Sequence, residues 1–342
     1  MARKLRIVII GYYGRLNAGD ALLRDSLSNI FRDHDLLFTS WFPGVDFLNL
    51  ADLVVVGGGS IWPGNPVFQN AKALARTLKT PLVVLGISAK HSDKKIKAET
   101  RYLIDKSVYF HVRDSKTKDI IGNDSIVVGT DLYWWSDHYL PQSQSRDFDT
   151  AALNLRSWDA AIWRPQDINE VVAKVFRRVI PFPFYFGSQH ASSVTMNDIQ
   201  LLKSLGYADT PGSFTVSCLQ ESTVTVAMRF HALLVSIRAG IPAVGFNYHN
   251  KTKALFSENG IPELCVPLDR PNSLRHALQH LREDYPRYQS LILKIRDNYL
   301  VSAQNDRAKF LSILNNIAPR EEDGLTRIRR LAKRYLARWA SG

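Results

Sequence analysis

The chain has 342 residues, of which 45% are hydrophobic and 22% are charged, and this balance excludes an intrinsically disordered protein. The net charge of +12 favours anionic partners, such as phosphorylated metabolites, anionic lipid, polyanionic glycan or nucleic acid, without choosing among them. The two cysteines, Cys218 and Cys265, lie far apart and outside any CxxC pattern, so the sequence gives no sign of a disulfide framework or a zinc site.

The first part of the chain alternates short β-rich runs with segments of helical spacing. Strands are expected over residues 5–11, 35–40, 52–59, 81–88, 109–114 and 125–131, and helices over 19–31, 66–78 and 94–107. Apolar strands separated by helices are typical of a parallel sheet that is covered on both faces. The pattern predicts a doubly wound α/β domain over residues 1–140.

A polar stretch without periodicity follows at 141–150 and is interpreted as a linker, after which the alternation restarts. Strands are expected over 151–157, 180–186, 223–228, 241–248 and 264–269, with helices at 166–179, 196–206, 231–240, 251–260 and in 271–318. The pattern predicts a second α/β domain over 151–320. Two such domains imply a cleft faced by the loops at the carboxyl ends of the strands.

Arg229 and His231 occupy the expected turn between the strand 223–228 and the following helix. A helix start offers unpaired N–H groups and a positive dipole end, so cations beside it suit a phosphate or a carboxylate. Arg156, at the end of the first strand of the second domain, is expected to face the same cleft. The alternatives to an anion site are that Arg229 forms a structural salt bridge and that His231 has a structural role.

Glycine-rich turns and strand ends provide candidates in the first domain. In "GYYGRLNAGDALL", Asn17 and Asp20 precede or begin a helix, and the alternative to a binding role is a turn with an N-cap. The stretch differs from GxGxxG, so it predicts no dinucleotide site. Gly57, Gly58 and Gly59 follow a buried strand and either pack closely or let a ligand approach the backbone. Asp131 ends the last expected strand.

These motifs together resemble the polysaccharide pyruvyl transferase family. The resemblance rests on "GYYGRLNAGDALL", "DLVVVGGGSIW", "VRDSKT", "GTDLYWW" and "MRFHALLVSIRAGIPAVGFNYHNK", which occur in the family's order between Ile7 and Gly260. The R-x-H turn, the helix after it, "GIPAVGFNY" and Lys251 are the most specific part. One departure is Ala21, where an acidic residue is expected after Gly-Asp.

The resemblance implies two Rossmann-like domains, as in GT-B glycosyltransferases, and transfer of pyruvate from phosphoenolpyruvate to a sugar as a ketal. Phosphoenolpyruvate is a co-substrate, and the scheme requires neither a cofactor nor a metal. The expected donor-site residues are Arg156, Arg229, His231 and Lys251, of which Arg229 and His231 are the expected catalytic pair. The expected acceptor-site residues are Asn17, Asp20, Gly57, Gly58, Gly59 and Asp131.

Two other functions remain open on the sequence. A GT-B glycosyltransferase using a nucleotide sugar needs a ribose-binding acid, which Glu258 or Glu263 supplies. A nucleic-acid-binding protein fits the basic charge, but that charge is dispersed and no binding motif occurs, so no nucleic-acid partner is expected.

The expected location is the cytoplasm, because the apolar run Leu5–Ile10 is too short for a signal peptide and no stretch has the length of a membrane span. The tail 321–342 has apolar residues on one helical face and basic residues on the rest of the surface. Such a helix either lies on an anionic membrane, where it brings the enzyme to a lipid-linked glycan acceptor, or folds back on the protein.

Overall fold

The computed structural model describes most of the chain: residues 4–14, 16–61, 65–89, 94–137, 140, 148–157, 164–187, 197–247, 250–270 and 272–319. The chain divides into two compact units. The first unit consists of Met1–Gly14, Leu22–Asp137 and Leu300–Gly342, and the second unit consists of Arg15–Ala21 and His138–Tyr299. The tail 321–342, predicted to be an amphipathic helix, lies outside the described residues.

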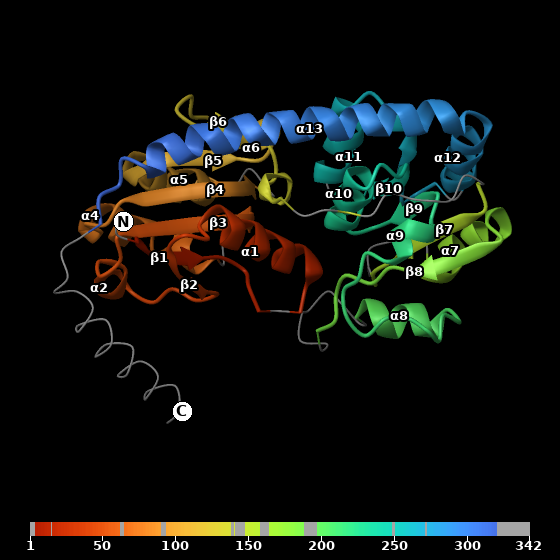
Figure 1. The fold of residues 1–342 in the computed structure, drawn as a ribbon, viewed down its shortest axis with the longest axis horizontal. Helices are drawn as coiled ribbons and strands as arrows, with labels where there is room; N and C mark the ends of the chain where they lie inside the picture. Colours follow the sequence, from red (N-terminus) through yellow and green to blue (C-terminus); the bar gives the residue numbers. More distant parts are fainter. Residues whose placement is uncertain are drawn as a thin grey trace. The chain divides into compact units, whose positions relative to one another are not determined.

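A six-stranded parallel sheet forms the centre of the first unit (Figure 1). The strands stand in the order β2-β1-β3-β4-β5-β6. Their bounds are β1 Arg6–Ile10, β2 Asp35–Thr39, β3 Leu53–Ile61, β4 Leu82–Ala89, β5 Ser107–Val112 and β6 Val127–Val128. The helices are α1 Ala18–Ile30, α2 Val45–Leu48, α3 Pro66–Gln69, α4 Ala71–Thr77, α5 Lys94–Lys106 and α6 Ser115–Ile121, with a 3-10 turn η1 at Leu132–Trp135.

The sequence predicted these strands, and the differences have local causes. The strand expected over 52–59, which contains the three glycines, continues two residues further as β3, to Ile61, and keeps its pairing with β4. Gly58 and Gly59 have φ values of 68° and 97°, a backbone conformation that glycine adopts without strain, and this explains why glycine stands at these two positions. The expected helix 66–78 is interrupted at Asn70, which stands between α3 and α4.

A five-stranded parallel sheet in the order β11-β10-β9-β7-β8 forms the centre of the second unit. The bounds are β7 Thr150–Asn154, β8 Arg178–Pro181, β9 Val224–Ala227, β10 Ala243–Asn247 and β11 Cys265–Pro267. The helices are α7 Pro165–Val175, α8 Asp198–Ser204, α9 Cys218–Glu221, α10 Phe230–Arg238, α11 Asn250–Glu258, α12 Asn272–Glu283 and α13 Tyr285–Leu314, with a 3-10 turn η2 at Pro262–Leu264.

Strand β8 is shorter than the sequence predicted. It was expected to reach residue 186 but ends at Pro181, and Pro183 follows two residues later. Proline lacks the N–H that a sheet ladder needs, so the segment after β8 leaves the sheet. That segment becomes part of the candidate site.

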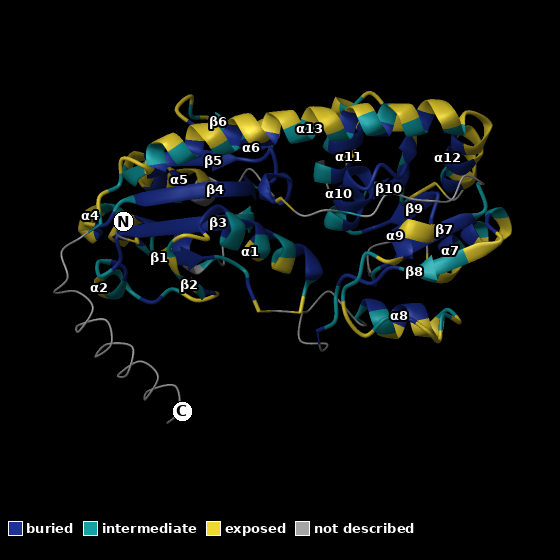
Figure 2. Cartoon of the chain, viewed as in Figure 1, coloured by how far each residue is buried: buried dark blue, intermediate teal, exposed yellow. Residues whose placement is uncertain are grey.

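The core of each unit is the apolar interior of its sheet. Leu53, Val54 and Val55 of β3 and Ala151, Ala152 and Leu153 of β7 are all fully buried. Figure 2 shows the central strands of the first unit as buried, whereas α13 carries exposed residues along its length. Strands that are buried on both faces read as continuous apolar runs, and this explains why the sequence located them.

Candidate functional site

The second sheet changes its direction of growth between β7 and β9. From β7 the chain adds β8 on one side, then returns to place β9, β10 and β11 on the other. In open α/β sheets, ligands bind outside the carboxyl ends of the strands at such a switch point. Arg156 follows β7 and Arg229 follows β9, so two of the predicted residues lie at this point.

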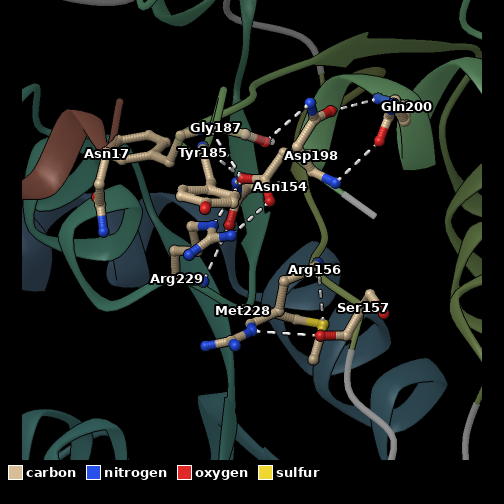
Figure 3. A network of polar contacts seen from close by, with 12 residues as sticks. Asn17, Asn154, Arg156, Ser157, Tyr185, Gly187, Asp198, Gln200, Met228 and Arg229 are labelled. Carbon is tan, nitrogen blue, oxygen red and sulfur yellow. Dashed lines mark hydrogen bonds and ion pairs between the residues drawn. The ribbon is translucent and has the colours of Figure 1, made fainter. Parts of the chain in front are cut away.

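Arg229 makes a bidentate ion pair with a buried aspartate. Its Nε lies 2.7 Å from Asp198 Oδ2, and its Nη2 lies 2.6 Å from Asp198 Oδ1. The Asp198 side chain has no exposed surface, and that of Arg229 is 12% exposed. In Figure 3 the Arg229 guanidinium points at the Asp198 carboxylate, with the Tyr185 ring alongside. The guanidinium carbon lies 5.3 Å from the centre of that ring.

The same network fixes the ends of three neighbouring segments. Asp198 Oδ2 also accepts hydrogen bonds from the backbone N–H groups of Phe184 and Tyr185, at 2.9 and 3.0 Å. Asn154, the last residue of β7, accepts from the Arg229 backbone N–H at 2.9 Å and donates to the Phe182 carbonyl at 2.8 Å. The turn after β9 is therefore held to the end of β7 and to the segment after β8.

Asp198 and Asn154 are site residues that the sequence did not predict. Asp198 stands in the first turn of α8, where an acidic residue is ordinary, so nothing in the sequence marked it. Asn154 gave a usable signal, because asparagine is depleted in strands and this one ends a fully buried strand. Its amide is hydrogen-bonded at both the oxygen and the nitrogen, as expected of a buried polar group.

Residues 16–21, which precede and begin α1, form a strap that packs beside the turn after β9. Ala18 donates its N–H to the Phe184 carbonyl at 2.7 Å, and Phe186 donates its N–H to the Leu16 carbonyl at 2.8 Å. Asn17 forms an antiparallel bridge with Tyr185, and its Oδ1 accepts from the Gly19 N–H at 3.0 Å. Asn17 therefore caps the start of α1, as the alternative interpretation of this motif held.

Gly19 faces the imidazole of His231. A Cβ on residue 19 would overlap the His231 Nδ1 atom and lie 2.9 Å from its Cγ. Only glycine fits at position 19, because the His231 ring occupies the space that a side chain would need. Two sequence motifs more than 200 residues apart meet here within one unit. His231 is half-buried in the first turn of α10.

Lys251 and Arg156 belong to the same edge of the second sheet. Lys251, in the first turn of α11, has its Nζ 4.9 Å from the centre of the Phe230 ring, and Phe230 in turn contacts His231 edge to face. The Arg156 backbone N–H lies 3.5 Å from Met228 Sδ. All four predicted donor-site residues therefore follow β7, β9 or β10, which are neighbours in the sheet.

The predicted acceptor-site residues divide between the two units. Asn17 and Asp20 were expected on the first domain, but they belong to the second unit because the strap pairs with the segment after β8. Gly57, Gly58 and Gly59 lie in β3 of the first unit, where the Gly57 carbonyl accepts the Tyr13 hydroxyl at 2.7 Å.

Asp131 also lies in the first unit, in a buried ion pair. Its Oδ2 is 2.7 Å from Arg113 Nη1, and its Oδ1 accepts the Tyr133 N–H, which caps η1. Both side chains of the pair are at most 5% exposed. Arg113 Nη2 also donates to Ser88 Oγ at 2.7 Å, so the ion pair joins the ends of β4, β5 and β6.

Three solved structures with a similar fold carry titles that name two UDP-N-acetylglucosamine 2-epimerases, one of them putative, and a glycotransferase. A putative UDP-N-acetylglucosamine 2-epimerase from Listeria monocytogenes matches 94% of this chain and 100% of its own, with a TM-score of 0.56 and 10% identity. The UDP-GlcNAc 2-epimerase from Neisseria meningitidis, bound to UDP-GlcNAc, matches 90% and 99%, with a TM-score of 0.53 and 9% identity. The glycotransferase of kitacinnamycin matches 91% and 100%, with a TM-score of 0.51 and 13% identity.

Identities this low show the fold alone, and the fold is the GT-B-like one, with two α/β units, that the sequence predicted. The comparison with curated proteins found no match. In the part of the chain that the structure describes, no helix combines the length and the apolar content that a bilayer crossing needs.

The family comparison is more specific than the fold. The model of the polysaccharide pyruvyl transferases matches residues 17–250, which is more than half of the chain. The match begins at Asn17 in the strap and ends just before Lys251, so it spans the turn that carries Arg229 and His231. The chain belongs to the polysaccharide pyruvyl transferase family.

Proposed function

We propose that this chain transfers pyruvate from phosphoenolpyruvate to two hydroxyl groups of one sugar in a polysaccharide or its precursor, forming a ketal. The observation that carries the proposal is the gathering of Arg156, His231 and Lys251 after three neighbouring strands, beside the start of α10. Phosphoenolpyruvate carries a carboxylate and a phosphate. Two cations and a helix N-terminus are suited to binding both groups.

The proposed reaction joins C2 of phosphoenolpyruvate to two sugar oxygens. The first hydroxyl oxygen attacks C2 while C3 takes a proton and becomes a methyl group. The bond between C2 and the bridging oxygen then breaks, phosphate leaves with that oxygen, and the second hydroxyl oxygen takes its place on C2. One hydroxyl proton balances the proton given to C3, and the other leaves with phosphate or solvent.

The roles of the donor-site residues follow from their surroundings. His231 is proposed to give or relay the proton, since imidazole titrates near neutral pH. Arg156 and Lys251 are proposed to bind the carboxylate and the phosphate. Arg229 has two guanidinium nitrogens engaged by Asp198, which supports a positioning role that holds the turn, in place of the direct contact with the donor expected from the sequence.

The residues expected on the acceptor side are proposed to have different roles. Asp20, half-buried in the first turn of α1, is proposed to orient or deprotonate an acceptor hydroxyl. Asn17 is proposed to hold that turn in place through its cap. Gly57, Gly58 and Gly59 are proposed to give the sugar close access to the backbone. Asp131 is proposed to act through Arg113 by fixing strand ends.

One pair of incubations tests the function. The protein is mixed with a panel of oligosaccharide acceptors and either phosphoenolpyruvate or UDP-sugars, and phosphate release, UDP release and product mass are followed. The expected result is phosphate release with a pyruvyl adduct. UDP release with sugar transfer would instead support the nucleotide-sugar alternative. His231→Gln should lose transfer, and His276→Gln, which changes an exposed histidine on α12, is the matched control.

We also propose that the tail 321–342 brings the enzyme to an anionic membrane and so to a lipid-linked acceptor. Each basic residue near such a surface contributes about 1 kcal/mol, so binding should weaken with salt. The full chain is expected to sediment with anionic liposomes at low salt. Deletion from Gly324 onward should release it and leave turnover of a water-soluble acceptor unchanged. Early melting of the shortened protein, with no liposome binding by the full chain, would contradict the proposal.

A further inference from the structure

A second candidate binding site lies in the second unit at the carboxyl ends of β10 and β11. It is a pocket of about 510 Å³, within the range of sites for small molecules. Asn247 ends β10, Asp269 and Arg270 follow β11, and Lys253 and Ser257 project from α11. Cys265, two prolines and a leucine complete the wall.

Helix α11 separates this pocket from the candidate donor site. Lys251 and Lys253 stand two positions apart on α11, which places them about 200° apart around the helix. Lys251 lies over Phe230 of α10, on the side of β9. Lys253 lines the pocket on the side of β11, where its charge lowers the pKa of Cys265 against the larger effect of burial. The pocket is therefore distinct from the donor site.

In the described part of the chain, the polar side chains of the pocket have no hydrogen-bond or ion-pair partners. Among the residues that the structure describes, none of the five side chains takes part in a hydrogen bond or an ion pair: Asn247, Lys253, Ser257, Asp269 and Arg270. Asp269 thus stands in one pocket with two cations and pairs with neither. Such a set can hold a ligand that presents an anion to the cations and hydroxyl groups to the carboxylate, amide and Ser257.

We infer that this pocket binds a sugar phosphate. Lys253 and Arg270 hold the phosphate group, while Asp269 and Asn247 accept and donate hydrogen bonds to the sugar hydroxyls. The apolar wall of prolines and leucine covers the C–H face of the sugar ring. The sugar phosphate is either a free metabolite or the phosphorylated end of a carrier-linked glycan. The inference is independent of the proposed pyruvyl transfer.

Cys265 offers a local measurement of occupancy that does not depend on activity. Its thiol lines the pocket, and burial raises its pKa to about 11, so alkylation is followed at alkaline pH. The other cysteine, Cys218, is 5% exposed and lies in α9, away from the pocket lining. Peptide mass mapping distinguishes the two thiols after treatment of the full chain with iodoacetamide.

The experiment measures how glucose 1-phosphate slows the alkylation of Cys265. Saturable protection is expected, and the concentration for half-protection should rise at least tenfold in Lys253→Ala/Arg270→Ala. Because Lys253 also affects the pKa of the Cys265 thiol, the alkylation rates with and without glucose 1-phosphate are compared within each variant. Lys174→Ala/Arg275→Ala removes the same charge from exposed helix positions. In this control, glucose 1-phosphate should protect Cys265 at the same concentration as in the unaltered chain. Absence of protection, or protection unchanged in Lys253→Ala/Arg270→Ala, overturns the inference.

Two further comparisons define the ligand. Asp269→Asn should weaken protection by glucose 1-phosphate and leave that by inorganic phosphate unchanged, because only the sugar reaches the carboxylate. Equal protection by inorganic phosphate and glucose 1-phosphate overturns the assignment of a sugar. A short alkyl ester of glucose 1-phosphate distinguishes the sources. Protection by this ester supports a carrier-linked glycan, and protection by the free sugar phosphate alone supports a soluble metabolite.

Discussion

Each unit has an arginine at the end of a central strand, paired with a buried aspartate, and a histidine two residues away. In the first unit these are Arg113, Asp131 and His111, and in the second unit Arg229, Asp198 and His231. His111 precedes its arginine and lies inside β5, fully buried. His231 follows its arginine and lies half-buried in the first turn of α10, against Gly19.

The surroundings of His111 explain why the same residue types serve structure in the first unit. The Gly86 N–H donates to His111 Nδ1 at 3.1 Å, and the rings of Tyr109 and Trp135 pack against the imidazole. Burial lowers the pKa of His111 to about 4, opposed by the carboxylates of Asp306 and Asp131. A neutral, enclosed imidazole does not reach a substrate. The position of each histidine relative to the end of its strand therefore decides which of the two is available for chemistry.

Replacing the two aspartates should have the greatest effect on stability of the changes considered. Asp131→Ala and Asp198→Ala should each cost about 3–5 kcal/mol of the stability of their own unit, because each leaves a guanidinium that is only 3% or 12% exposed without its partner. Hydrogen exchange in β5 and β9 reports the two units separately.

The two variants should differ in catalysis. The Asp198 change should also raise the KM for phosphoenolpyruvate, because it releases the turn that carries His231. The Asp131 change should leave that KM unchanged. The Asp→Asn variants preserve folding if the alanine forms fail to fold. Equal changes in the KM for phosphoenolpyruvate in both folded variants would show that the two pairs play one role.

Replacing the two histidines separates chemistry from stability. His231→Ala should lower kcat by about 10³-fold, the range for loss of a general acid, with a change in stability of about 1–2 kcal/mol. His111→Gln should lower the stability of the first unit and leave kcat unchanged once the protein is folded. Steady-state kinetics and melting of the same preparations measure both effects. Near-normal transfer by folded His231→Ala would remove this residue from the mechanism.

The sequence predicted the elements better than the contacts between them. The strands of both sheets were located because fully buried parallel strands are continuous apolar runs. The turn with Arg229 and His231 was expected where it lies, because a strand and a helix flank it closely. The ion pair with Asp198 was not predicted, because it joins residues 31 positions apart through tertiary structure. The strap with Asn17 was assigned to the first domain, because no sequence period shows that it pairs with Tyr185.

The pH dependence of stability should show the enclosed histidine directly. Between pH 6.5 and about 4 the unfolded state protonates His111 and the folded state does not, so stability falls as the pH falls through this range. The loss is on the order of 3 kcal/mol at the acidic end, since each pKa unit corresponds to about 1.4 kcal/mol. Above pH 6.5 this contribution is constant.

Denaturant titrations of the chain and of His111→Gln at pH 7 and pH 4.5 isolate the contribution of His111. The difference between the two proteins should shrink at the lower pH, because only the unaltered chain loses stability through this group. Other titrating groups cancel in the comparison. A difference that stays constant would mean that the folded imidazole takes up its proton in the ordinary range.

Replacing Asp20 should have a smaller effect on kcat than replacing His231. This change tests whether Asp20 takes part in the reaction, whereas Asp131 and Asp198 hold the structure together. Asp20→Asn keeps a side chain suited to the start of a helix and removes the charge. If Asp20 orients or deprotonates the acceptor hydroxyl, kcat should fall by about 10²-fold with unchanged melting. Asp25→Asn is the matched control, because Asp25 stands on the same helix with a side chain 45% exposed beside Arg24. If both variants keep the kcat of the unaltered chain, Asp20 belongs with the structural carboxylates, and the acceptor base must be sought elsewhere.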